Sequence, residues 1–198
     1  IKRFPVSGYR RQGRGGKGII AAKSKDEDFI EEIFVANTHA YILCFTNKGQ
    51  VHWLKVYQLP EGSRQSRGKA IVNLLPLKAG EVVTTIIPVK EFVEGQYLAL
   101  FTKKGIVKKS LLKDYSRPRN GGVRGVVLDE GDELIKARMT TGDDEVMIAT
   151  ANGNASRFNE NDMRPAGRVT RGSKGISLVN DEVIGAIIAE PETCILTI

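Results

Sequence analysis

The sequence repeats a pair of short apolar segments joined by a tight turn. Residues 41–51, YILCFTNKGQV, share their pattern with 97–107, YLALFTKKGIV, and residues 146–155, VMIATANGNA, follow it more loosely. Each copy is an apolar run, a polar turn with a glycine, and a second run that becomes basic or polar. Glycine supplies the positive φ that a tight hairpin turn requires, and Asn-Gly is a strong hairpin signal. We therefore expect the same β-hairpin three times.

Two further elements recur with the hairpins. The first is basic and glycine-rich, and ends in a cation, a small residue and a β-branched residue; the small residues are Gly18, Ala70, Gly125 and Gly175. Their spacings of 52, 55 and 50 residues are close to the length of a propeller blade. The second element is a strand-like segment rich in β-branched residues, at 29–35, 81–88, 132–139 and 182–188.

These repeats divide the chain into four units of about four short strands each. The expected units are 1–38, 39–92, 93–141 and 142–190, within one domain covering 1–198. Apolar residues nowhere sustain helical spacing for three turns, and only 111–115 reads as one helical turn. The fold class is therefore all-β, a β-propeller with about four visible four-stranded blades.

The two ends of the chain read as two halves of one hairpin. Residues 191–198 resemble a first strand and residues 1–4 a second strand. Two arrangements are compatible with this pattern: the chain is part of a five- or six-bladed disc, or 191–198 closes a four-bladed ring onto 1–4. We favour part of a larger disc.

Charge and composition narrow the class of partner. The net charge of +7 and the pI of about 9.4 favour anionic partners, chiefly nucleic acid or anionic lipid. No apolar run approaches the roughly 20 residues that span a bilayer, and no amphipathic helix supports a membrane surface role. We expect a cytoplasmic protein, with Cys44 and Cys194 as small buried hydrophobes and no metal site.

The most specific motif lies near the N-terminus, in residues 9–19, YRRQGRGGKGI. It resembles the gyrase A box, whose pattern is Gln-Arg-Arg-Gly-Gly-Arg/Lys-Gly. Six of seven positions match, with Gly13 in place of the first arginine and two arginines just upstream. Residues 164–175 form a later, degenerate copy. The repeats extend the resemblance over essentially the whole chain, which is similar to the family of C-terminal domains of the DNA gyrase A protein.

This resemblance implies a β-pinwheel, a propeller whose blades exchange strands, with double-stranded DNA bent around its basic rim. It implies that the chain is not an enzyme by itself and holds no cofactor. The catalytic residues, ATP and Mg²⁺ would belong to other parts of an A2B2 holoenzyme with the gyrase B protein, which introduces negative supercoils. The resemblance also implies a nucleoid-associated location.

The expected DNA contacts are the glycine-rich basic loops, which recur once per unit. Glycines allow close approach of the backbone to phosphate, and cations release counterions from DNA without reading its sequence. Because equivalent loops of a propeller share one edge, they would form a curved basic surface that can bend a duplex. The candidate residues are Arg10, Arg11, Gln12, Arg14, Gly15, Gly16, Lys17, Gly18, Arg64, Arg67, Lys69, Arg117, Arg119, Arg124, Arg168, Arg171 and Lys174.

Three alternatives stay open. The A-type protein of topoisomerase IV carries a similar C-terminal domain without a clear box. A protein-interaction propeller would have a neutral or apolar face instead of a basic rim. An enzyme would need a convergent site, but nucleophile-elbow, zinc-protease and P-loop motifs are absent.

Several other residues have a structural interpretation. Trp53 could stack on a base, but a tryptophan more often packs in the core, and His52 has no partner motif. The lysines that flank one hairpin are of a kind that commonly protects strand edges: Lys103, Lys104, Lys108 and Lys109.

Overall fold

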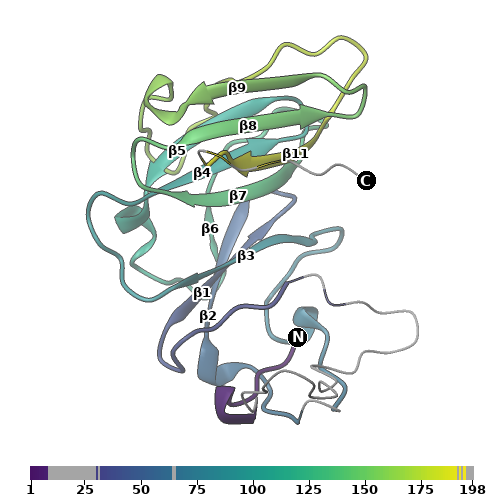
Figure 1. The fold of residues 1–198 in the computed structure, drawn as a ribbon. Helices are drawn as coiled ribbons and strands as arrows, with labels where there is room; N and C mark the ends of the chain where they lie inside the picture. The colour runs from purple at the N-terminus through teal and green to yellow at the C-terminus, as the bar shows by residue number, and fades with distance from the viewer. Residues whose placement is uncertain (9–29, 31, 64–65, 191, 193, 195–198) are drawn as a thin grey trace, which may run out of the picture.

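The computed structural model describes residues 1–8, 30, 32–63, 66–190, 192 and 194. This part of the chain contains eleven strands and short 3-10 turns but no α-helix, so the all-β class is confirmed (Figure 1). The strands are β1 (Tyr41–Thr46), β2 (Gln50–Lys55), β3 (Val83–Val89), β4 (Tyr97–Thr102), β5 (Ile106–Leu111), β6 (Val123–Arg124), β7 (Leu134–Thr140), β8 (Glu145–Thr150), β9 (Ala155–Asn159), β10 (Ser173–Lys174) and β11 (Val183–Ile188).

The described residues also contain five 3-10 turns, of which all but the first lie between strands. They are η1 (Val6–Gly8), η2 (Val56–Gln58), η3 (Ile71–Asn73), η4 (Leu112–Tyr115) and η5 (Glu160–Asp162). Turns η2, η4 and η5 each follow the second strand of a hairpin directly. The helical turn expected at 111–115 is therefore confirmed as η4, and the same turn recurs in the neighbouring units.

The strands form three antiparallel sheets whose outer strands cross between units. The sheet orders are β3-β1-β2-β6, β10-β5-β4-β7 and β11-β8-β9. Strand β6 belongs to the unit of β4 and β5, yet it pairs with β2 of the preceding unit. Strand β10 likewise leaves the unit of β8 and β9 to pair with β5. This exchange is the pinwheel topology that the resemblance predicted.

The exchanged strands lie on the outside of the propeller. The opposite strands of the sheets, β3, β7 and β11, pack along one another, with β7 between the other two (Figure 1). They form the inner side, and the fourth position of each complete sheet therefore belongs to the rim. Within the described residues β6 and β10 occupy that position.

The first hairpin strands of the two four-stranded sheets, β1 and β4, are largely apolar because both of their faces are covered. Along β4, Leu98 and Leu100 face the core shared with the first sheet, whereas Ala99 and Phe101 face the core shared with the third. Since successive side chains point to opposite faces, a strand between two cores has no polar side to present. Strand β1 shows the same alternation, which explains the unbroken runs seen in the sequence.

Two sequence-based expectations are wrong. Residues 30 and 32–35 form no strand, although 29–35 was predicted as one. In the other units that strand pairs with the first strand of its own hairpin, and the described residues contain no hairpin strand that pairs with 30 and 32–35. Cys194 is exposed, whereas Cys44 is buried and its pKa is raised to about 12 by that burial; both thiols are free.

No helix in the described residues has the length and apolarity to cross a membrane.

Candidate nucleic-acid interface

The exchanged strands place one exposed cation at the same position of successive units. Arg124 of β6 lies opposite Gln50 of β2, and Lys174 of β10 lies opposite Ile106 of β5. Lys69 joins the preceding segment in the same way, with its backbone N–H donating to the carbonyl of Ile1 at 3.0 Å. All three cations are exposed and form no ion pair with any described residue. The rim therefore carries a periodic series of positive charges that have no ion-pair partner in the described part of the chain.

The glycine that follows this cation has a packing role. Gly125 and Gly175 donate their backbone N–H groups to Gly49 and Gly105, at 2.8 and 2.9 Å. A Cβ on Gly175 would lie 2.5 Å from Val107 Cγ1. Only glycine allows the exchanged strand to approach the hairpin this closely. The spacing of small residues seen in the sequence thus follows from strand exchange at these two positions.

The other predicted contacts divide into three groups. Arg117 and Arg119 are exposed in the loop that leads into β6, and Arg67 is exposed two residues before Lys69. Arg168 is half-buried and Arg171 is already bonded within the chain to Asp129. The remaining predictions lie outside the described residues: Arg10, Arg11, Gln12, Arg14, Gly15, Gly16, Lys17, Gly18 and Arg64.

A cleft of about 370 Å³ separates β5 from the loop that leads into β10. We name it the lysine cleft, because Lys108 and Lys109 lie on its β5 side; the loop side is 163–166 and 170–173. Lys108 Nζ donates to Gly125 O at 2.7 Å and to Arg168 O at 2.5 Å. It therefore ties β5 to both neighbouring exchanged segments. Edge protection of an exposed strand, the expectation for Lys108 and Lys109, is wrong: their exposed fractions are 1% and 3%.

Lys109 forms a buried ion pair with the next unit. Its Nζ lies 3.0 Å from Glu160 Oε2 and donates to Gly142 O at 3.1 Å, and it sits 4.5 Å from the centre of the Tyr97 ring. Glu160 is fully buried and accepts three further hydrogen bonds, from Gly142 N, Asp144 N and the Thr140 hydroxyl. Such complete bonding is what a buried charge pair requires.

The protonation of these groups follows from their surroundings. Burial lowers the pKa of Lys108 to about 8; the Asp114 carboxylate opposes this shift and Arg168 adds to it. Burial alone would raise the pKa of Glu160. The bonds from Asp144 N–H, Lys109, Thr140 and Gly142 N–H outweigh it, so the pKa of Glu160 lies below its ordinary value.

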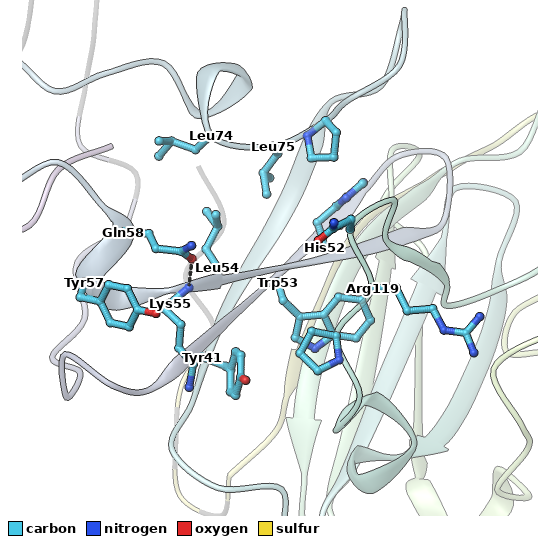
Figure 2. A pocket seen from close by; sticks show the side chains of 13 residues that line it. Tyr41, His52, Trp53, Leu54, Lys55, Tyr57, Gln58, Leu74, Leu75 and Arg119 are labelled. Atoms are coloured by element: carbon cyan, nitrogen blue, oxygen red, sulfur yellow. Dashed lines mark hydrogen bonds between the residues drawn. The ribbon is translucent and has the colours of Figure 1, made fainter.

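The equivalent cleft one unit earlier is aromatic. It measures about 410 Å³ between β2 and the loop that leads into β6, and we name it the tryptophan cleft (Figure 2). In the strand registers Phe45 pairs with Val51 and Phe101 with Val107, so Trp53 takes the place of Lys109. Trp53 Nε1 donates to Tyr115 O of the next unit at 2.8 Å. That bond identifies Trp53 as an anchor between units, as its packing interpretation predicted.

His52 takes the place of Lys108 but bonds within its own unit. Its Nε2 lies 3.2 Å from Glu81 Oε1, which also accepts the Thr46 hydroxyl at 2.8 Å. Burial would raise the pKa of Glu81, but bonds from Lys78 N–H, Thr46 and His52 hold it below its ordinary value. In Figure 2, Trp53 and Arg119 lie at one end of the cleft, and Lys55 and Tyr57 at the other.

Sequence reasoning missed the lysine bridges between units. The signal available was that Lys108 and Lys109 are consecutive in a strand where one side chain must point toward each face. Their carbonyl and carboxylate partners lie 17 to 60 residues away in the sequence, so no local pattern could indicate them. In the described residues no three His, Cys, Asp or Glu side chains gather as metal ligands would.

A family model matches this chain in four segments, at 1–37, 40–90, 96–141 and 144–190. Its description is DNA gyrase C-terminal domain, beta-propeller. The chain belongs to this family. The resemblance deduced from the box and the repeats is therefore confirmed, and so is the propeller fold.

Curated relatives agree with the gyrase C-terminal domain family. The chain is 49% identical over 199 residues to the DNA gyrase A protein of Salmonella typhimurium, and 47% identical over 198 residues to that of Escherichia coli strain K12. Each alignment covers 100% of this chain and 23% of the relative. The chain thus spans about a quarter of the length of these relatives.

Solved structures show the same fold. The C-terminal domain of DNA topoisomerase IV matches with a TM-score of 0.82 and 28% identity, covering 96% of this chain and 58% of that one. A DNA gyrase A C-terminal domain matches with a TM-score of 0.67 and 27% identity, covering 94% and 60%. Backbone shape alone therefore does not distinguish the two enzymes.

Proposed function

We propose that this chain binds duplex DNA through its phosphates along the rim, bends it and wraps it with one handedness. The observation that carries this proposal is the exposed cation, without an ion-pair partner among the described residues, at one position of each described exchanged segment: Lys69, Arg124 and Lys174. Cations spaced along a curved edge neutralise successive phosphates without contacting bases. Bending a duplex of 20–30 base pairs costs about 1–6 kcal/mol, so several contacts from several units are required.

The proposal extends to the box and the adjoining loops by sequence. The copies Arg171-Gly172-Ser173-Lys174-Gly175 and Arg14-Gly15-Gly16-Lys17-Gly18 have the same order of residue types. We assign Arg10, Arg11, Gln12 and residues 14–18 to the first contact on the duplex. Arg64, Arg67, Arg117, Arg119, Arg168 and Arg171 would add contacts between the rim cations.

In the whole protein, the wrapped DNA would take part in the supercoiling reaction of gyrase. We infer that the chain acts within the gyrase A protein of an A2B2 assembly with the gyrase B protein, in the cytoplasm and on the nucleoid. It would present a DNA segment for ATP-dependent negative supercoiling. The proposal assigns catalytic residues, ATP and Mg²⁺ to the other parts of that holoenzyme. Identity of 49% to a gyrase A protein over the entire chain favours gyrase over topoisomerase IV, which matches at 28%.

The test compares two variants with equal loss of charge. Replacing Lys69, Arg124 and Lys174 with Gln should weaken binding of a fluorescent duplex about ten- to a hundredfold at 0.1 M salt. The slope of log K against log salt should become shallower by about 2–3 units, or roughly 0.9 per phosphate contact. The control replaces three cations that lie off the exchanged strands, Lys48, Lys103 and Lys136. Equal effects of the two variants would contradict the assignment of the rim.

A further inference from the structure

Among the predicted DNA-contacting arginines that the structure describes, Arg171 is the one that forms an ion pair with a carboxylate. Its Nε and Nη2 lie 2.9 and 2.5 Å from the same oxygen, Asp129 Oδ2. Asp129 belongs to the preceding unit, five residues after Arg124. The two side chains are 55% and 40% exposed, so solvent and ligands reach both. The Asp129 bonds raise the pKa of Arg171, which stays charged.

The backbone fixes this meeting of two units. Val127 N donates to Thr170 O at 2.9 Å, which brings the segment after β6 against the segment before β10. Gly172, next to Arg171, adopts a φ of +104° and lies against Val107 and Lys108 of β5. Arg171 thus leaves a constrained turn close to Asp129, and the ion pair follows from the strand exchange.

Arg171 lines the lysine cleft together with other cations. The other lining cations are Lys108, Lys109 and Arg164. Lys108 is bonded to carbonyls and Lys109 to Glu160, so neither is open to an anion from outside. Arg164 is exposed and forms no ion pair within the described residues. An incoming phosphate at this cleft therefore meets Arg164 and Arg171, and Arg171 is already held by Asp129 from the preceding unit.

We propose that Asp129 competes with a DNA phosphate for Arg171 and so limits the affinity of this part of the rim. The proposal rests on the proposed function, since it names a residue that tunes the same surface. A phosphate oxygen takes the guanidinium donors that Asp129 Oδ2 occupies, and the displaced carboxylate turns to water. No covalent step is involved. Exposed ion pairs of this kind are weak, so DNA can displace Asp129 at small cost.

The direct test is Asp129→Asn with a fluorescent duplex titrated at several salt concentrations. Removing a competitor of that strength should tighten binding about two- to fivefold. Because Arg171 reaches the same phosphate with or without Asp129, the salt slope should change by less than the roughly 0.9 of one phosphate contact. In an Arg171→Gln background the same substitution should have less than half of that effect on affinity. Unchanged affinity in Asp129→Asn, or a full gain in the Arg171→Gln background, would overturn the proposal.

Glu32→Gln is the matched control. It removes the same charge and frees Lys136, 3.6 Å away on the inner strand β7, far from the exchanged strands in the topology. Binding should match the unaltered chain; a gain equal to that of Asp129→Asn would show that net charge alone acts, and would overturn the competition. The unaltered chain also separates the two proposals. If it fails to bind duplex DNA, the proposed function falls; if it binds and Asp129→Asn changes nothing, only the competition falls.

Discussion

The tryptophan cleft and the lysine cleft occupy equivalent places, but different side-chain bonds join the neighbouring units beside them. In the first, Trp53 crosses to the next unit with one neutral hydrogen bond, and His52 stays with Glu81 of its own unit. In the second, Lys108 and Lys109 both cross, one to carbonyls and one to a buried carboxylate. The backbone joint is the same: a glycine-tipped hairpin receives an exchanged strand. Strand exchange therefore defines the fold, and the side chains set how strongly, and at which pH, neighbouring units hold together.

The largest expected difference between the clefts lies in the buried ion pair. Glu160→Gln leaves the Lys109 ammonium buried without its counter-charge, which should lower the free energy of unfolding by about 3–5 kcal/mol. Urea denaturation measures this loss. The double variant Lys109→Met/Glu160→Leu should recover only part of it, because it removes the unpaired charge but leaves Gly142 N–H, Asp144 N–H and the Thr140 hydroxyl without their acceptor. A loss below about 1 kcal/mol in Glu160→Gln would show that the pair does not hold the two units together.

A smaller loss is expected in the tryptophan cleft. Trp53→Phe leaves Tyr115 O without its indole donor while keeping an aromatic ring, and should lower the free energy of unfolding by about 1–2 kcal/mol. The same urea experiment gives the comparison. If this loss equals that of Glu160→Gln, the clefts contribute alike and the contrast between them is wrong.

The two clefts should also differ in the pH dependence of stability. With the pKa of Lys108 at about 8 in the folded chain, below its ordinary value of 10.5, both the folded and unfolded states are charged at this residue below pH 8. Between those two pH values the unfolded chain binds more protons, so the contribution of Lys108 to stability rises with pH. The free energy of unfolding of the unaltered chain, relative to that of the Lys108→Met variant, should therefore increase from pH 8 to 10.5. If the difference in free energy of unfolding between the unaltered chain and Lys108→Met does not change over this pH range, the lowered pKa of Lys108 is contradicted.

The sequence predicted the fold well because the fold is built from local signals. Hairpins at 41–51, 97–107 and 146–155, and the closing strands β3, β7 and β11, all follow from alternation, turn glycines and β-branched residues. The crossing of β6 and β10 came only from the family resemblance. No spacing rule separates a strand that pairs within its unit from one that pairs with the preceding hairpin, since both follow the hairpin at the same distance.

The sequence predicted which basic residues belong to the candidate site, but it did not predict which groups within the chain bond to them. Arg124 and Lys174 are exposed on the rim, as a surface for phosphates requires. Arg171 looked equivalent to them in the sequence, but Asp129 holds it, 42 residues away. Lys108 and Lys109 looked like surface charges and are buried between units. Long-range partners of this kind arise from strand exchange, and composition and spacing carry no trace of them.

The most direct measurement is the linking number trapped by the chain. A nicked plasmid is saturated with the chain, sealed by ligase, stripped of protein and separated on a gel. The account predicts a linking difference of one sign that grows with the ratio of chain to DNA. It should disappear when Lys69, Arg124 and Lys174 are replaced by Gln and persist when Lys48, Lys103 and Lys136 are replaced. Binding without a linking difference, or an unchanged difference in the rim variant, would contradict wrapping around the rim.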